Sequence, residues 1–540
     1  MTSPLSRREF VALAATGVAA AGSPAAAAAA PRDGATAAPF QAPREDALFE
    51  KTAADLSAMM QRGELTSRAL VERYLQRIAA MDKQGPAINA VIELNPDAPA
   101  IAVAMDAERK AGKVRGPLHG IPVLIKDNLD TADRMKTTAG SLALADAPAP
   151  KADAAVVLKL RLAGAVILGK TNLSEWANFR STHSSSGWSG RGGQTLNPYA
   201  LDRTPSGSSS GSAAAAAASL CAAAVGTETD GSIVSPASVC GLVGIKPTVG
   251  LLSRSGIIPI SRTQDTAGPM ARTVRDAAML LGAMAGPDPA DPATLLAQFE
   301  ADYTRFLRIN GLKGARLGVV RNLLGQQPPV DAVIRPALDV LKARGATLVE
   351  VELKSTAYDE AELEVLLYEF KAGLNAYLAG RGGAVKDLAA LIAFDNGRRE
   401  AEMPFFGQEL LLQAQAKGSL SDPAYLKALA TCAQARSSIT GLLEKHQLQA
   451  LVGPTSGTPW LTDHVNGDSS SGLSFSSPAA VGGCPHITVP AGLAFGLPVG
   501  LSFVAGPWQE AQLLPLAYAF EQVSAARRPP RFQPTASARL

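Results

Sequence analysis

The sequence predicts an α/β protein with a mixed or parallel sheet and helices on its faces. Helical patterns alternate with short apolar strand patterns along most of the chain, which is typical of this class. A composition of 47% hydrophobic and 18% charged residues over 540 residues is globular and can bury a large core. No Pro-rich or Gly-rich boundary separates a free domain, so we expect one large domain.

The first predicted elements are two helices. Residues 51–81 carry apolar side chains at helical spacing, and Thr66 and Ser67 stand before the second run as an N-cap. These helices are expected to cover the sheet.

The strand patterns follow. IPVLIKDN at 121–128 is a short apolar run that ends in polar groups, and residues 154–169 read as a helix, a stop at Gly164 and a strand. Similar units recur at ARLGVV (315–320), a helix at 331–345, TLVEVEL (347–353), LQALVGPT (448–455), HITVPAG (486–492) and VGLSFVAG (499–506).

One region departs from this alternation. From about 355 to 445 the pattern is helical almost throughout, with YDEAELEVLLYEFKAGLNAYLAG as its clearest segment. We interpret it as a helical insertion that covers one side of the sheet. Both a functional role and simple packing are open to it.

Composition excludes several classes of function. A net charge of +3 without a long Lys/Arg block argues against a nucleic-acid partner, and the body of the chain lacks an apolar stretch long enough for stable membrane insertion. The five histidines form no HxxxH or HxH pair and the four cysteines no CxxC pair. We therefore expect no metal, no disulfide scaffold and no cofactor.

The N-terminus is set apart as a targeting segment. Arg7 and Arg8 precede an alanine-dominated, weakly hydrophobic run, which resembles a twin-arginine export signal. We expect residues 1–38 to be the signal and processing region, with the export machinery as a transient partner, and residues 39–540 to be the folded domain. The protein would then be periplasmic or secreted. The alternative is an amphipathic first helix.

The stretch TPSGSSSGS at 204–212 looks like a flexible linker when it is taken alone. Six alanines follow it directly, and the chain then runs through an apolar segment into GTETDGSIVSP at 226–236. A linker does not usually lead into a core, so we expect an ordered segment.

Three motifs in order, GIPVLIKDN, PSGSSSGS and GTETDGSIVSPAS, resemble the amidase signature family. Further similarity covers about residues 50–525, including ILGKTNLSEWANF, GGQTLNPY, CGLVGIKPTVG and GLPVGLSFVAGPWQEAQLLPLAYAFEQ. The resemblance implies a single domain whose mixed, mostly parallel central sheet is covered by helices on both faces. It also implies a catalytic loop at 204–212, with the alanines forming a buried helix.

The resemblance implies a catalytic set as well. Ser232 would be the nucleophile, Ser208 a bridging serine after a cis Gly207–Ser208 bond, and Lys126 the terminal base, with Ser209 supporting Ser208. A serine hydroxyl needs a neighbouring base, and burial lowers the pKa of a lysine toward the range in which it can serve as one.

The same segment is expected to form an oxyanion hole. Small residues around the nucleophile let the backbone N–H groups of Thr229, Asp230, Gly231 and Ser232 converge on one point. Asp230 stands where the commoner family motif GTDTGGS has a glycine. This residue tolerates unusual dihedral angles better than most.

Cysteine is the other nucleophile that the chain offers. None of the four cysteines has a basic neighbour in sequence, which a reactive thiolate would need. We expect all four to be core residues: Cys221, Cys240, Cys432 and Cys484.

The substrate class is inferred from a position at which this chain differs from many members of the family. Many family members carry an arginine two residues after the nucleophile, and this chain has Val234. With SEWANFRSTHSSSGWSGRGGQ, the whole is most similar to bacterial peptide amidases, which remove the C-terminal amide of peptides. Trp176 and Trp188 are candidates for walls of the substrate pocket, with core packing as the alternative.

The sequence leaves three alternative functions. A broad-specificity aliphatic or aromatic amidase would share the chemistry. The amidase subunit of a tRNA-dependent amidotransferase is disfavoured by the export signal and by the lack of a basic patch. A non-catalytic exported binding protein is disfavoured by the intact Lys126, Ser208 and Ser232.

Overall fold

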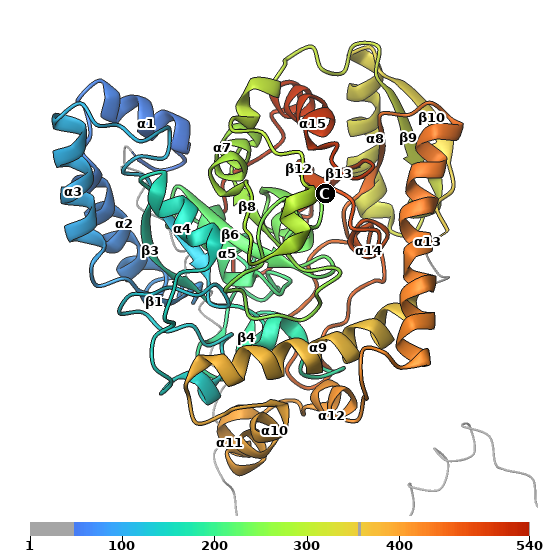
Figure 1. Ribbon diagram of the computed structural model, residues 1–540. Helices are drawn as coiled ribbons and strands as arrows, with labels where there is room; N and C mark the ends of the chain where they lie inside the picture. The colour runs from blue at the N-terminus through green and yellow to red at the C-terminus, as the bar shows by residue number, and fades with distance from the viewer. Residues whose placement is uncertain (1–47, 355–357, 539–540) are drawn as a thin grey trace, which may run out of the picture. The chain divides into compact units, whose positions relative to one another are not determined.

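An eleven-stranded mixed sheet forms the centre of the computed structural model, which describes residues 48–354 and 358–538 (Figure 1). In spatial order the strands are β1 (Val91–Leu94), β3 (Val166–Thr171), β2 (Pro122–Lys126), β6 (Ala223–Glu228), β8 (Thr266–Ala271), β7 (Val243–Lys246), β12 (His486–Ala494), β13 (Leu497–Val504), β11 (Ala450–Pro454), β9 (Arg316–Val320) and β10 (Thr347–Val351). The α/β class and the predicted strands are confirmed. A separate two-stranded ribbon pairs β4 (Trp188–Ser189) with β5 (Gly193–Gln194).

Parallel pairing occurs in two blocks of the sheet. One block is β3–β2–β6 and the other is β11–β9–β10. Between them, neighbouring strands pair antiparallel from β6 through β8, β7, β12 and β13 to β11, and β1 pairs antiparallel with β3 at the edge. The tight turn between β12 and β13 leaves them no other arrangement, because parallel neighbours need a long crossover.

Helices pack against this sheet. The two predicted N-terminal helices are present, and the Thr66 side chain caps the second by accepting from the Ala69 N–H. This N-terminal pair is α1 (Ala53–Gln61) and α2 (Ser67–Met81). The other α-helices outside the 355–445 region are α3 (Ala98–Lys110), α4 (Ala155–Leu162), α5 (Ser210–Ala217), α6 (Val234–Val239), α7 (Val274–Met284), α8 (Pro328–Ala343), α14 (Ser476–Val481) and α15 (Glu510–Ser524).

The alanine run forms the buried helix α5, so the segment before it is not a linker. Every residue of α5 is buried. A β-carbon on Gly211 would come within 2.3 Å of the Ala90 carbonyl oxygen and 2.7 Å of the Asn172 nitrogen. Only small side chains let the helix lie this close to its neighbours.

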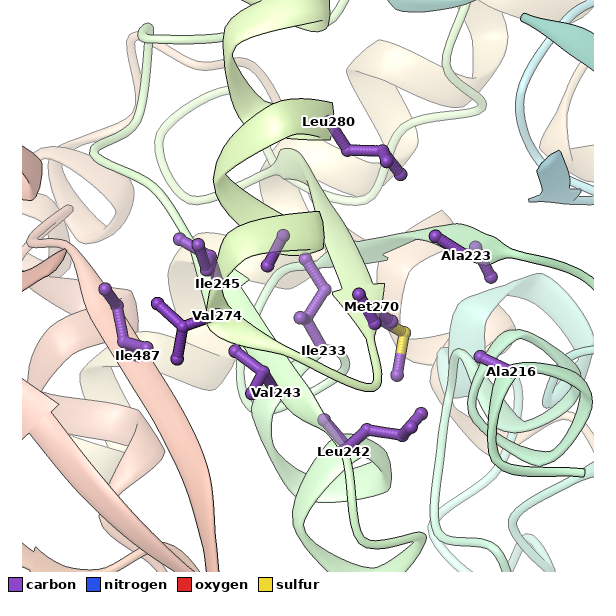
Figure 2. Packing of buried hydrophobic residues seen from close by; sticks show 14 of the residues in the cluster. Ala216, Ala223, Ile233, Leu242, Val243, Ile245, Met270, Val274, Leu280 and Ile487 are labelled. Atoms are coloured by element: carbon purple, nitrogen blue, oxygen red, sulfur yellow. The ribbon is translucent and has the colours of Figure 1, made fainter. Parts of the chain in front are cut away.

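The largest hydrophobic cluster of the described residues includes Ile233, the residue that follows Ser232 (Figure 2). Ile233 lies among Val243 and Ile245 of β7 and Met270 of β8 in the same view. Glycines leave it room: a β-carbon on Gly268 would lie 2.8 Å from Ile233 Cδ1. The residue next to Ser232 is therefore anchored in the core.

The region from 358 to 445 is helical, as predicted. It consists of α9 (Asp359–Arg381), α10 (Leu388–Gly397), α11 (Arg399–Glu402), α12 (Glu409–Gln415) and α13 (Pro423–Lys445). The three short helices lie below α9 in the view of Figure 1, and residues of α10 and α12 share a second hydrophobic cluster with it. The proposed export signal lies outside the described residues.

No helix among residues 48–354 and 358–538 combines the length and apolar character needed to cross a membrane.

Candidate active site

Lys126, the last residue of β2, is fully buried beside the loop at 204–212. Its Nζ donates to Ser208 Oγ at 2.8 Å and to Thr227 Oγ1 at 2.9 Å, and it lies 3.3 Å from the Thr227 carbonyl oxygen. Strand β6 delivers Thr227, and β6 pairs with β2 in parallel. The sheet therefore brings two of the three sequence motifs into direct contact.

The environment of Lys126 favours the neutral amine. Burial lowers the pKa of Lys126 to about 7, while the charges of Asp265 and Glu228 act in the opposite direction. Close to neutral pH a large share of the lysine is therefore unprotonated and able to accept a proton.

Ser208 is held by its backbone. The Gly207–Ser208 peptide bond is cis, and the Ser208 carbonyl accepts from the Ser174 N–H at 3.1 Å. A β-carbon on Gly207 would lie 2.2 Å from Ser174 Oγ, so this position has room only for glycine. With the backbone fixed, the Ser208 side chain is directed at Lys126.

Ser209 connects this loop to the segment that holds Ser232. Its hydroxyl donates to the Thr227 carbonyl at 3.0 Å and accepts from the Thr227 N–H at 3.2 Å. Its N–H donates to the Ser232 carbonyl at 3.2 Å. Ser209 thus supports the arrangement through the backbone of both neighbouring segments.

The Ser232 hydroxyl is not engaged. Among residues 48–354 and 358–538 it has no hydrogen-bond partner, and the residue as a whole is 8% exposed. The structure therefore joins Lys126 and Ser208 directly and places Ser232 beside them through Ser209.

Backbone N–H groups next to Ser232 are also unused. Within the described part of the chain, the N–H groups of Thr229, Asp230, Gly231 and Ser232 have no acceptor. Gly231 has φ +75°, the left-handed region that glycine adopts without strain, and Asp230 has no positive φ. The glycine that remains in the motif thus occupies the position that requires one.

Glu228 fastens the other end of this segment. Its Oε2 accepts from the Ile233 N–H at 2.7 Å and from the Val234 N–H at 3.0 Å. Burial raises the pKa of Glu228, and the charge of Lys246 opposes that rise. The carboxylate thus binds the N–H groups at the start of α6 and does not bind the N–H groups of 229–232 that precede them.

The sequence and the fold match known proteins. Residues 69–514 match the Amidase family. The chain belongs to the amidase family. A probable amidase of Arabidopsis thaliana is 42% identical over 497 residues, which cover 89% of this chain and 92% of that protein. A glutamyl-tRNA(Gln) amidotransferase subunit of Alkalilimnicola ehrlichii is 37% identical over 494 residues, which cover 88% of this chain and 98% of that protein.

Solved structures extend the similarity. The peptide amidase PAM, in complex with the competitive inhibitor chymostatin, has a TM-score of 0.86 and 53% identity, covering 89% of this amidase and 99% of that chain. The native peptide amidase of Stenotrophomonas maltophilia has a TM-score of 0.85 and 52% identity, covering 90% and 99%. The protein is thus an amide hydrolase with the fold of the peptide amidases.

The three pocket candidates of the amidase are all buried. Trp176 belongs to the hydrophobic cluster shared with α9, and Trp188 packs edge-on against Phe406 with ring centroids 5.1 Å apart. Val234 is fully buried in the first turn of α6. The two tryptophans therefore join the helical insertion to the loops around the site.

The cysteines of the amidase are core residues, as expected. All four are free and buried. Burial raises the pKa of the Cys221 thiol to about 12 and those of Cys432 and Cys484 to about 11, so none of these three is poised as a thiolate.

Three polar residues of the site were not singled out from the sequence. Thr227 and Glu228 lie within the GTETDGS motif, so their proximity to Ser232 was available as a signal. Asp265 lies more than thirty residues further on, and only the fold brings it to Thr229.

Proposed function

We propose that this amidase hydrolyses the C-terminal carboxamide of peptides and releases ammonia and the free peptide acid. The observation that carries this proposal is the hydrogen bond between the buried Lys126 and Ser208, next to the unengaged hydroxyl of Ser232. The similarity to peptide amidases of known structure supports the substrate class.

In the proposed mechanism Ser232 attacks the carboxamide carbon. Ser208 takes the proton of Ser232 as it passes its own to the neutral Lys126. The free N–H groups at 229–232 stabilise the oxyanion that forms. The proton then returns through Ser208 to the departing ammonia, and water hydrolyses the acyl-enzyme by the same route.

The charges around the site support a neutral substrate end. Val234 replaces the arginine that could pair with a carboxylate, and the nearby arginines are committed. Arg180 pairs with Glu175 at 2.7 Å, and Arg191 pairs with Glu93. A carboxylate close to the scissile amide would lose its hydration without a free arginine to pair with.

The test compares kcat/KM for ammonia release from a dipeptide amide, a simple aliphatic amide, glutamine and a small monoamide of a dicarboxylic acid. We expect the dipeptide amide to be preferred by at least about tenfold, the range that one or two pocket contacts provide. Ser232→Ala is the control and should remove turnover of every substrate. Equal rates with the aliphatic amide would indicate a broad-specificity amidase, and a preference for glutamine would overturn the peptide assignment.

A further inference from the structure

We propose that Asp265 is a positioning residue of this site: it fixes Thr229 at the start of the oxyanion segment and is the counter-charge for Lys126 once that lysine is protonated. The inference rests on the proposed function, because it assigns a role within the same proton transfer. Asp265 comes directly before β8 and lies outside all the motifs that define the site.

The Asp265 carboxylate is held at both oxygens. Oδ1 accepts from the Thr229 hydroxyl at 2.6 Å, and Oδ2 accepts from the Ile260 and Ser261 N–H groups at 2.8 Å each. Three donors leave the carboxylate little freedom to rotate. Thr229 is therefore attached to a fixed point at the end of β6.

The loop that carries Asp265 is fastened to the helical insertion. Ser261 Oγ donates to Glu369 of α9 at 2.5 Å, and Gln264 Nε2 donates to Glu362 of α9 at 2.7 Å. The same Gln264 nitrogen lies 3.4 Å from the Thr229 carbonyl oxygen. The insertion thus braces the oxyanion segment through this loop.

Two carboxylates act electrostatically on Lys126, and their situations differ. The end of β6 links Asp265 to Lys126, because Thr227 binds Lys126 Nζ and Thr229, two residues further on, binds Asp265. In keeping with this arrangement, Asp265 and Glu228 both raise the pKa of Lys126. The charge of Lys246 acts on Glu228. Glu228 Oε2 also accepts hydrogen bonds from the Ile233 and Val234 N–H groups at the start of α6. For Asp265, the arginine Arg254 supplies the opposing charge that lowers its pKa.

Arg254 is itself engaged. It is paired with Asp291, and Glu369 also acts on it. Burial raises the pKa of Asp265 to about 6, against its hydrogen bonds with Thr229, Ser261 and Ile260. At pH 7 Asp265 is therefore mostly ionised, and it can stabilise the ammonium that the first step produces.

The primary test is Asp265→Asn, which keeps the shape and removes the charge. We expect kcat to fall about 10- to 100-fold, the range for loss of one preorganised electrostatic contact, with KM nearly unchanged. The acid limb of the pH profile of kcat/KM should move to lower pH, because Lys126 loses a charge that favours its ammonium form. An acid limb at the wild-type position would overturn the counter-charge role.

Thr229→Val separates the two roles. It removes the hydroxyl that Asp265 holds and keeps the carboxyl group, whose pKa rises because one hydrogen bond is lost. We therefore expect kcat to fall while the acid limb moves less than in Asp265→Asn. Wild-type kcat in this variant would overturn the positioning role, and this readout remains if Asp265→Asn does not fold.

Asp276→Asn is the matched control. Asp276 is a buried carboxylate that accepts two backbone N–H groups, those of Ala53 and Ala54, outside the site. It should lower the melting temperature without moving the acid limb, and a shift as large as that of Asp265→Asn would overturn the proposal.

Labelling of wild-type Ser232 with a fluorophosphonate separates the proposed function from the proposed role of Asp265. An unlabelled, inactive wild type contradicts the proposed function, whereas a labelled, active one leaves only the role of Asp265 in question.

Discussion

At the scale of single residues, the site depends on a lysine placed where an ammonium ion is costly. Lys126 has two hydroxyl partners, and neither carries a charge. The carboxylates that act on it are held elsewhere: Asp265 by Thr229 and two backbone N–H groups, and Glu228 by the first turn of α6. Desolvation therefore outweighs attraction, and the pKa of Lys126 falls to about 7.

This predicts the pH dependence of the wild-type enzyme. Because the neutral amine is the active form, kcat/KM should rise as the pH rises through about 7, the pKa of Lys126. Lys126→Ala should lower kcat by about a thousandfold or more. Initial-rate ammonia release from about pH 5 to 9 measures both.

A double variant provides the control for that prediction. If Lys126 and Ser208 act as one relay, Lys126→Ala combined with Ser208→Ala should lose little more than either single change. Multiplicative losses would contradict a shared proton path. Near-wild-type turnover of Lys126→Ala at neutral pH would show that another group is the base.

At the scale of elements, glycines in two neighbouring strands make the anchoring of Ile233 possible. Gly268 in β8 and Gly244 in β7 both face Ile233. A β-carbon on Gly268 would also lie 2.1 Å from the Ile245 carbonyl oxygen, which cannot move without separating the strands. Strand glycines that look unfavourable from propensity alone are thus explained by close packing.

Gly268→Ala should therefore destabilise the protein. We expect the free energy of unfolding to fall by about 1–3 kcal/mol, the usual cost of overpacking a core. Gly380→Ala is the matched control, because Gly380 lies in helix α9 with nothing within 4 Å of its added β-carbon. It should gain about 0.5–1 kcal/mol. Denaturant unfolding of both variants measures the difference, and equal effects would contradict the packing argument.

The sequence predicted elements better than it predicted their pairing. Strands β2, β3, β9, β10, β11, β12 and β13 were expected from their apolar patterns, as were the helix before β3 and the helix between β9 and β10. Strand β6 was seen only as an apolar segment, because AAVGTE has few of the β-branched residues that usually mark a strand. The antiparallel centre was not predicted, since pairing depends on which edges meet in space and not on local pattern.

At the scale of the whole molecule, the helical insertion is tied to the loops around the site by buried charges. Arg180 pairs with Glu175 and lies over the ring of Phe406 at 4.3 Å, and its guanidinium also donates to the Glu402 carbonyl. Asp395 of α10 is fully buried, and neither of its oxygens has a hydrogen-bond partner among the described residues. Burial and the nearby Glu402 raise the pKa of Asp395 to about 7.

Asp395 should make the protein less stable at high pH. Its folded pKa is raised, so the folded state binds the proton more tightly, and stability falls as the pH rises from about 4 toward 7. Asp395→Asn should therefore raise the melting temperature more at about pH 8 than at about pH 5. Thermal unfolding at both values is the measurement. Asp339→Asn, at an exposed carboxylate of α8, is the control, and a gain for Asp395→Asn that did not depend on pH would contradict the prediction.

The candidate site was largely predictable because its members lie in three short motifs. The motifs could not predict two contacts that connect them. Thr227 is the second hydroxyl partner of Lys126, and Asp265 accepts a hydrogen bond from Thr229. Both contacts join residues that are far apart in the chain, and one sequence carries no signal for that proximity.

The reactivity of the four buried cysteines can report local unfolding of the protein. Cys221, Cys240 and Cys484 belong to the main hydrophobic cluster, whereas Cys432 lies in a small cluster between α9 and α13. Three of the thiols are fully buried and Cys432 is 5% exposed, so a thiol reagent added to the native protein should react slowly until one of these regions opens. Modification of Cys432 alone would indicate local opening of the helical insertion. Modification of the other three cysteines would indicate unfolding of the core around the sheet.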